Sequence, residues 1–134
     1  MIKRYLAAML TATSFTVSVC AMAQAMSSGE YSAAKDSVEA DYNSAKASCG
    51  SLADNAKDIC MAEAKGKKEV AKAELDARYR PSKNADYKVA EAKAEADYAV
   101  ARAKCNDQSG DAKDICVKQA KAAMAKAKAD AKAQ

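Results

Sequence analysis

The sequence predicts an all-α protein made of two tandem antiparallel helical hairpins, with four helices in all. Three observations predict this fold: an internal duplication, apolar residues at helical spacing, and a turn-forming segment inside each copy. The same apolar stripes suit either a compact four-helix bundle or an extended string of two hairpins. The sequence therefore leaves open how the two hairpins dock on each other.

The duplication is seen when the chain is aligned with itself at a shift of 56 residues. Residues 30–78 then match residues 86–134 without a gap, and 20 of the 49 aligned pairs are identical. Chance similarity between Ala- and Lys-rich stretches would not hold cysteines and tyrosines in register, so we divide this region into repeat 1 (residues 26–80) and repeat 2 (residues 81–134). The aligned identities include Cys49 with Cys105, Cys60 with Cys116, Tyr31 with Tyr87 and Tyr42 with Tyr98.

The first segment of each copy carries an apolar stripe in steps of 3, 4, 4, 3 and 4 residues. These steps place the stripe on one side of an α-helix, and the 11-residue spacing of its tyrosines corresponds to about 3.67 residues per turn. The remaining positions suit a solvated helix face. The stripe residues are Tyr31, Ala34, Val38, Tyr42, Ala45 and Cys49 in the first copy, and Tyr87, Ala90, Ala94, Tyr98, Ala101 and Cys105 in the second.

A turn-forming segment follows, at residues 50–55 and 106–111, and a second helix begins after it. We expect Asn55 and Asp111 to be the N-caps, with Asp58 and Asp114 in the electropositive first turn. The second helices continue the apolar face. Its residues are Cys60, Ala64, Ala71 and Leu75 in the first copy, and Cys116, Ala120, Met124, Ala127 and Ala131 in the second.

Three features suggest where this pattern is interrupted. Pro81 should end or kink the second helix and mark the boundary between the copies. The run Gly66-Lys67-Lys68 weakens the apolar face, so we expect bending or solvent exposure there. The tail from Lys121 onward is close to an Ala/Lys alternation, and such ends usually fray.

Residues 1–25 have the pattern of a secretory signal peptide. Lys3 and Arg4 precede an apolar stretch at residues 6–19, and small residues then lead to Ala25. We predict cleavage between Ala25 and Met26, with cleavage after Ala23 as the alternative. An uncleaved membrane anchor would need a longer apolar stretch, and lipidation of Cys20 would need a smaller residue than the valine before it. The predicted location is periplasmic or secreted.

Removal of this segment leaves 20 Lys and Arg against 18 Asp and Glu. So small an excess of positive charge argues against specific nucleic-acid binding, which depends on many uncompensated cations. Ala supplies most of the apolar residues, and Phe, Trp and His are absent from the mature chain. A chain of this composition buries a thin core, and small domains with thin cores commonly need covalent staples.

The four mature cysteines form two C-x10-C pairs, each of which spans a predicted turn. Because export permits oxidation, we predict two local disulfides, Cys49 with Cys60 and Cys105 with Cys116. Four cysteines allow three connectivities, and the local one makes each repeat self-contained. Zinc ligands and redox-active pairs are normally closer in sequence than these cysteines, and intermolecular disulfides remain a further alternative.

The sequence predicts that the protein is not an enzyme and that it binds no cofactor or metal ion. It has no His, no glycine-rich phosphate loop and no nucleophile motif. Its carboxylates, such as Asp36, Glu39 and Asp41, alternate with lysines at helical spacing and are expected to lie on solvated faces. The tyrosines are expected to pack between helices. Residues 113–132 carry six lysines but few large apolar residues, so contact with anionic surfaces should be weak at most.

The chain resembles small exported Ala/Lys-rich helical proteins of Gram-negative bacteria. Its A-K-A-E-A-D run at residues 92–97 is similar in composition to the central helical region of TolA, and its 11-residue rhythm resembles late-embryogenesis-abundant (LEA) proteins. These resemblances imply an envelope protein or a stress protectant. We therefore expect a non-enzymatic periplasmic structural or protein-interaction module whose partner is an envelope protein or a second copy. The alternatives are an LEA-like protectant and a weak anion binder.

Overall fold

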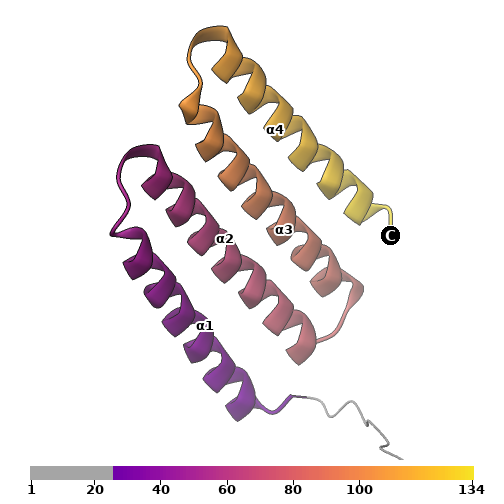
Figure 1. Cartoon of the computed structure of the whole chain (residues 1–134). Helices are drawn as coiled ribbons and strands as arrows, with labels where there is room; N and C mark the ends of the chain where they lie inside the picture. Colours follow the sequence, from indigo (N-terminus) through magenta and orange to yellow (C-terminus); the bar gives the residue numbers. More distant parts are fainter. Residues whose placement is uncertain (1–25) are drawn as a thin grey trace, which may run out of the picture.

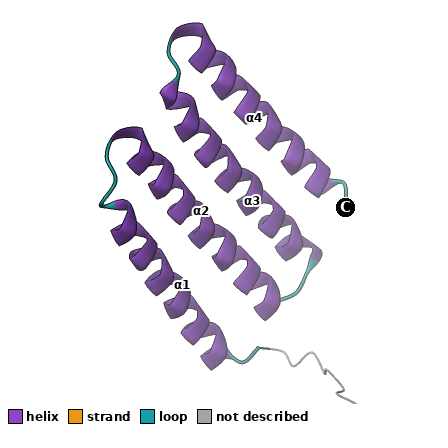
Figure 2. Cartoon of the chain, viewed as in Figure 1, coloured by secondary structure: helices purple, strands orange, loops and turns teal. Residues whose placement is uncertain are grey.

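The computed structural model describes residues 26–134, and the regular elements in this range are all helical (Figure 2). They follow the order α1 (Ser28–Cys49), α2 (Asp54–Tyr79), α3 (Lys83–Lys104), the short 3-10 helix η1 (Cys105–Asp107) and α4 (Gly110–Lys132). The predicted all-α class with four helices is confirmed. The predicted signal peptide, residues 1–25, lies outside the described residues.

The four α-helices lie side by side in one row, and each runs antiparallel to the next (Figure 1). Extensive contacts join α1 to α2, α2 to α3 and α3 to α4, and the contact between α2 and α3 is the largest of the three. Within residues 26–134, α1 and α4 therefore occupy the two outer positions. The arrangement is an open row in which the α1–α2 turn and the α3–α4 turn lie at the same end (Figure 1).

Serine side chains cap the first helix of each repeat. Ser27 Oγ accepts a hydrogen bond from the backbone N–H of Glu30 (3.2 Å), and Glu30 Oε2 accepts one from the backbone N–H of Ser27 (2.8 Å). This is a reciprocal capping box. At α3, Ser82 Oγ accepts from the backbone N–H of Ala85 at 3.0 Å. Ser82 directly follows Pro81, and α2 ends at Tyr79, so the helix ends before the proline as predicted.

The predicted N-caps of the second helices are wrong. The structure places Ala53 and Ser109 at these positions, with no side-chain cap hydrogen bond, and Asn55 and Asp111 lie inside the helices. Both helices begin instead with a residue of positive φ, Asp54 (49°) and Gly110 (55°). These residues are equivalent under the 56-residue shift. A left-handed residue reverses the chain here, so the helix starts before the residues with the best capping side chains.

The prediction that Asp58 and Asp114 lie in the first turns of these helices is also wrong. Because the helices begin at Asp54 and Gly110, the acidic residues of their first turns are Asp54 and Asp111. Asp58 and Asp114 lie one turn further along, where the helix dipole acts on a carboxylate more weakly.

The predicted stripes are the faces that the helices bury. On α1, every residue that is not exposed belongs to the stripe from Tyr31 to Cys49. The six stripe positions from Tyr87 on α3 to Cys105 in η1 are all at least partly buried. The fully buried hydrophobic residues are Cys49, Ala64, Leu75, Ala94 and Cys105. Leu75 is the one large side chain among them, so the core is thin and the helix backbones lie close together.

The expected exposure at residues 66–68 is found at Lys67 but not at Gly66. This glycine is buried within α2, where the helix continues without a break. A Cβ atom placed on Gly66 would lie 2.8 Å from the Cβ of Ala96 on α3. Gly66 therefore marks a close approach of the two helices, which a larger residue would prevent.

The C-terminal tail, for which the sequence predicts fraying, is part of helix α4 in the structure. Helix α4 continues to Lys132. Ala127 of the predicted stripe is exposed, and Lys128 takes its place as a partly buried residue. The tail is held because this lysine reaches across to carboxylates on α3.

Candidate functional site

Two disulfides close the ends of the two hairpins. The structure joins Cys49 to Cys60 with a Cα–Cα separation of 5.6 Å, and Cys105 to Cys116 with a separation of 5.7 Å. Both distances lie in the ordinary range for a disulfide. Cys49 and Cys105 are 1% and 0% exposed, so one sulfur of each bridge is part of the core. These are the pairs that the sequence predicts.

The two disulfide-bearing turns contact each other directly. Asn55 Nδ2, near the start of α2, donates a hydrogen bond to Asp107 Oδ1 in η1 at 2.7 Å. The Oδ1 atom of Asn55 is buried without a hydrogen-bond partner. This contact links repeat 1 to repeat 2 at the turn end of the row, a juxtaposition for which the sequence carries no signal.

An ion pair is repeated in the two hairpins. In repeat 1, Lys72 Nζ lies 3.7 Å from Glu39 Oε2, and in repeat 2, Lys128 Nζ lies 2.5 Å from Glu95 Oε1. The second lysine also reaches Glu91 at 3.2 Å. The hydrogen bond with Glu95 is the largest cause that raises the pKa of Lys128, while burial opposes it. Both partners are identical under the 56-residue shift, which is the signal from which this pair could have been predicted.

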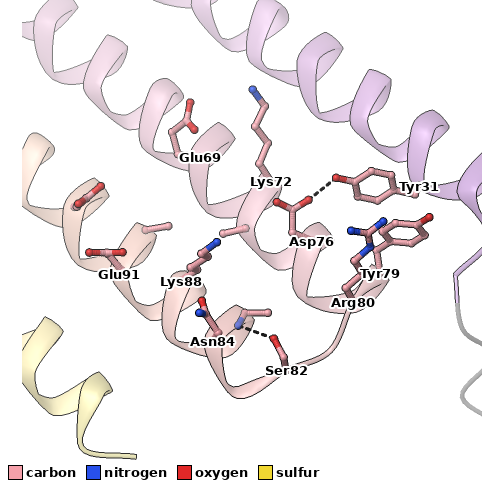
Figure 3. Close-up of a pocket in the computed structure, with 14 residues that line it drawn as sticks. Tyr31, Glu69, Lys72, Asp76, Tyr79, Arg80, Ser82, Asn84, Lys88 and Glu91 are labelled. Carbon is pink, nitrogen blue, oxygen red and sulfur yellow. Dashed lines mark hydrogen bonds between the residues drawn. The ribbon is translucent and has the colours of Figure 1, made fainter.

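An open hollow of about 900 Å³ lies at the end of the row opposite the disulfides, between α2 and α3, and extends to Tyr31 of α1 (Figure 3). The Tyr31 hydroxyl donates to Asp76 Oδ1 at 2.5 Å. Its ring stacks on that of Tyr79, with centroids 4.2 Å apart and planes 17° from parallel. The guanidinium of Arg80 lies 5.3 Å from the Tyr79 centroid.

The charges in this hollow are mixed. Its lining carries Lys72, Lys88 and Arg80 together with Glu69 and Glu91 (Figure 3). The hydrogen bond to the carboxylate of Asp76 raises the pKa of Tyr31, because it favours the protonated phenol. This geometry holds the ends of α1 and α2 together.

The tyrosines lie at the helix seams, as predicted. Besides Tyr31, Tyr42 is partly buried with the ammonium of Lys68 3.9 Å from its ring centroid, and Tyr98 lines a groove between α3 and α4. Cation–π contact of this kind adds modest stabilisation to packing. The structure therefore assigns these three rings to helix–helix contact.

Within residues 26–134, no three His, Cys, Asp or Glu side chains are grouped so that they would hold a metal ion. The carboxylates that approach one another, Glu91 and Glu95, do so on either side of Lys128. No helix in the same range has the length and apolar character needed to cross a bilayer.

Sequence reasoning located the cysteines and the tyrosine stripe, but it missed the contacts between stripes. Asp76 aligns with Lys132 in repeat 2, so the repeat does not mark the cluster of Asp76, Tyr79 and Arg80. Comparison of the chain with known protein families, curated proteins and solved structures finds no match.

Proposed function

We propose that the protein is a non-enzymatic structural or protein-interaction module of the periplasm or cell envelope. The observation that carries this proposal is the open row of four helices. Among residues 26–134, each inner helix is covered on both sides by its neighbours, whereas α1 and α4 each have one long uncovered side (Figure 1). Open helical rows of this kind offer extended surfaces for contact with other proteins.

The disulfides support the same role. A thin core stabilised by two local bridges keeps a stable surface without a large hydrophobic interior. The mixed charges of the hollow between α2 and α3 suit recognition of a polar protein surface better than tight binding of a small apolar molecule.

The test is retention of envelope proteins on the immobilised chain under non-reducing conditions. The matched control is a chain in which all four cysteines of the two bridges are replaced by Ser. We expect a defined set of envelope proteins to be retained by the disulfide-bonded chain and not by the control. Retention of the same proteins by both chains, or of none by either, would contradict the proposed module.

A stress-protectant role makes a different prediction. A protectant of the LEA type is mostly unfolded in dilute buffer and gains helix on drying. The proposed module should give a strongly helical circular dichroism spectrum in dilute buffer, and drying should change it little. A spectrum of a disordered chain in buffer would favour the protectant.

A further inference from the structure

The uncovered sides of α1 and α4 repeat, in modified form, the two surfaces by which α3 and α2 pack together. From this we infer that the protein assembles head to tail, with α4 of one copy packed on α1 of a second copy. The inference rests on the proposed function and names its partner as a second copy of the chain.

The template for this contact is the interface between α2 and α3, the largest in the molecule. Gly66 and Ala96 meet at its closest approach and set its antiparallel register. Helical spacing and burial assign one further face to each helix. These faces are Ile59, Ala62, Gly66, Val70 and Ala73 on α2, and Val89, Ala92, Ala96, Val100 and Ala103 on α3.

The 56-residue shift carries these faces onto the outer helices. The α2 face corresponds to Ile115, Lys118, Ala122, Lys126 and Ala129 on α4, and the α3 face to Ala33, Asp36, Ala40, Ser44 and Ala47 on α1. All ten residues are exposed in the single chain. Ile115, at 54%, is one of two exposed large hydrophobic residues in residues 26–134. Its counterpart Ile59 is partly buried, which indicates that this surface of α4 lacks a covering helix.

The closest approach is preserved between the outer faces. Gly66 corresponds to Ala122, and Ala96 corresponds to Ala40. Two alanines at the crossing point permit helix backbones to pack at the short end of the usual interaxial range. The steric requirement of the internal interface is therefore met by α4 of one copy and α1 of the next.

The substituted positions are complementary in charge. The register set by Gly66 and Ala96 brings Val70 level with Ala92, and the same register brings Lys126 level with Asp36 of the second copy. Within one chain, Lys126 pairs with Asp130 on its own helix, and both side chains are well exposed. Because such surface pairs contribute little to stability, Lys126 is free to turn toward Asp36.

The polar contacts at the edges of the template also have compatible counterparts. The hydrogen bond from Asn55 to Asp107 corresponds to a Ser51 hydroxyl that would donate to Asp111. The ion pair of Lys93 with Glu74 (2.8 Å) corresponds to Ser37 facing Asp130. In both cases a hydrogen-bond donor still faces an acceptor. In the first case the donor is the counterpart of Asp107 rather than of Asn55.

The resulting contact is heterologous, because α4 of each copy meets α1 of the next. Such contacts form rings when the rotation closes and open filaments when it does not. Apolar residues of the template are replaced by Lys126, Lys118, Asp36 and Ser44, so the contact between copies should be weaker than the internal one. We therefore expect reversible association that depends on protein and salt concentration.

The experiment is analytical ultracentrifugation of the purified, processed chain from micromolar to near-millimolar concentration. The wild type should gain mass with concentration, and Ala122→Glu should remain monomeric. Asp36→Lys and Lys126→Asp should each weaken association, because each places like charges at the contact. An equimolar mixture of these two variants should restore it, since every junction in the mixture can pair Lys with Asp.

The matched controls are Asp41→Lys and Lys121→Asp, which make the same charge changes one residue away from Ala40 and Ala122, about a quarter of a turn off the outer faces. They should associate like the wild type, and circular dichroism should show unchanged helix in every variant. A wild type that stays monomeric throughout, controls as impaired as the test variants, or a mixture that fails to associate would each overturn the inference.

These outcomes are separable from those of the proposed function. A chain that stays monomeric but retains an envelope protein contradicts head-to-tail assembly and leaves the interaction role intact. A chain that assembles but retains no other protein supports the assembly and removes the case for a second kind of partner.

Discussion

Gly66 permits α2 and α3 to approach closely because it has no side chain. The position has an exposed counterpart, Ala122 on α4, which none of the other described helices approaches. The same position in the repeat is therefore glycine where a helix covers it and alanine where none does. Helix propensity favours alanine at both positions, so packing decides the residue at Gly66.

Replacing Gly66 with Ala should lower the free energy of unfolding by about 1–2 kcal/mol, because overpacking at the Ala96 contact outweighs the gain in helix propensity. Adding Ala96→Gly should recover part of the loss. Urea denaturation followed by circular dichroism measures both effects. The control is Gly29→Ala, whose Cβ would meet nothing within 4 Å. An unchanged stability for Gly66→Ala would show that the helices separate without cost.

Tyr31 supplies a prediction about pH. Its pKa is raised mainly by the hydrogen bond to Asp76, so the folded state favours the protonated phenol. The stabilisation is therefore present below the ordinary tyrosine pKa of 10.0 and is lost as the pH rises through the raised value. In Asp76→Asn the pKa of Tyr31 should fall toward 10.0, as measured by NMR titration of the tyrosine ring. Asp58→Asn on the same helix is the control, and an identical Tyr31 titration in all three proteins would contradict the assignment.

Helix α4 is the element whose structure is least expected from its amino-acid composition. An Ala/Lys tail with few large apolar residues has little to bury, and such a sequence usually frays. We expect Lys128 to oppose this fraying, because its side chain, 25% exposed, bridges to Glu91 and Glu95 on α3. The corresponding ion pair of Lys72 with Glu39 joins α2 to α1, so an equivalent ion pair links the two helices of each repeat.

Lys128→Met should free the C-terminal turns of α4 while the rest of the chain remains folded. Amide hydrogen exchange is the measurement, and we expect faster exchange in residues 125–132 with little change in α2. Lys126→Met is the matched control, because within one chain that lysine pairs with Asp130 on α4 and makes no ion pair with α3. Equal protection of the tail in the wild type and in Lys128→Met would show that alanine packing alone holds the helix.

The molecule as a whole depends on a small core and two covalent staples. Only five of the 109 described residues are fully buried hydrophobic residues, and two of these five are cysteines of the disulfides. The bridges should therefore supply much of the net stability. The bridges lie at one end of the row, together with the contact between Asn55 and Asp107. The opposite end is held by the cluster around Tyr31.

Proteolysis of the unreduced protein followed by mass spectrometry should recover Cys49 bound to Cys60 and Cys105 bound to Cys116, with no free thiol. Removing either pair by Cys→Ser substitution should cost about 2–3 kcal/mol in the free energy of unfolding, because each bridge restricts the unfolded chain. Urea denaturation of the two double variants gives the values. A peptide linking the two turns, Cys49 with Cys105 or Cys60 with Cys116, would contradict the local pairing.

The local features of this protein follow from the sequence because they depend on residues near one another in the chain. The stripe from Tyr31 to Cys49, the end of α2 before Pro81 and the local cysteine pairs all arise from spacing within one helix or turn. The N-caps of α2 and α4 were mispredicted even so, because the backbone reversal at Asp54 and Gly110 outweighed the capping preference of Asn55 and Asp111.

Other features depend instead on which helix faces meet. They are the open row of helices, the burial of Gly66 and the ion pairs of Lys128 with α3. The second face of α2 could have remained exposed to solvent or packed against a partner or α3, because an alanine-rich surface is compatible with all three environments. The antiparallel fit of Gly66 against Ala96 resolves this choice by permitting the two helices to approach closely at that point. Such a fit joins residues far apart in the chain, so helical periodicity predicts each face while its partner is determined by packing in three dimensions.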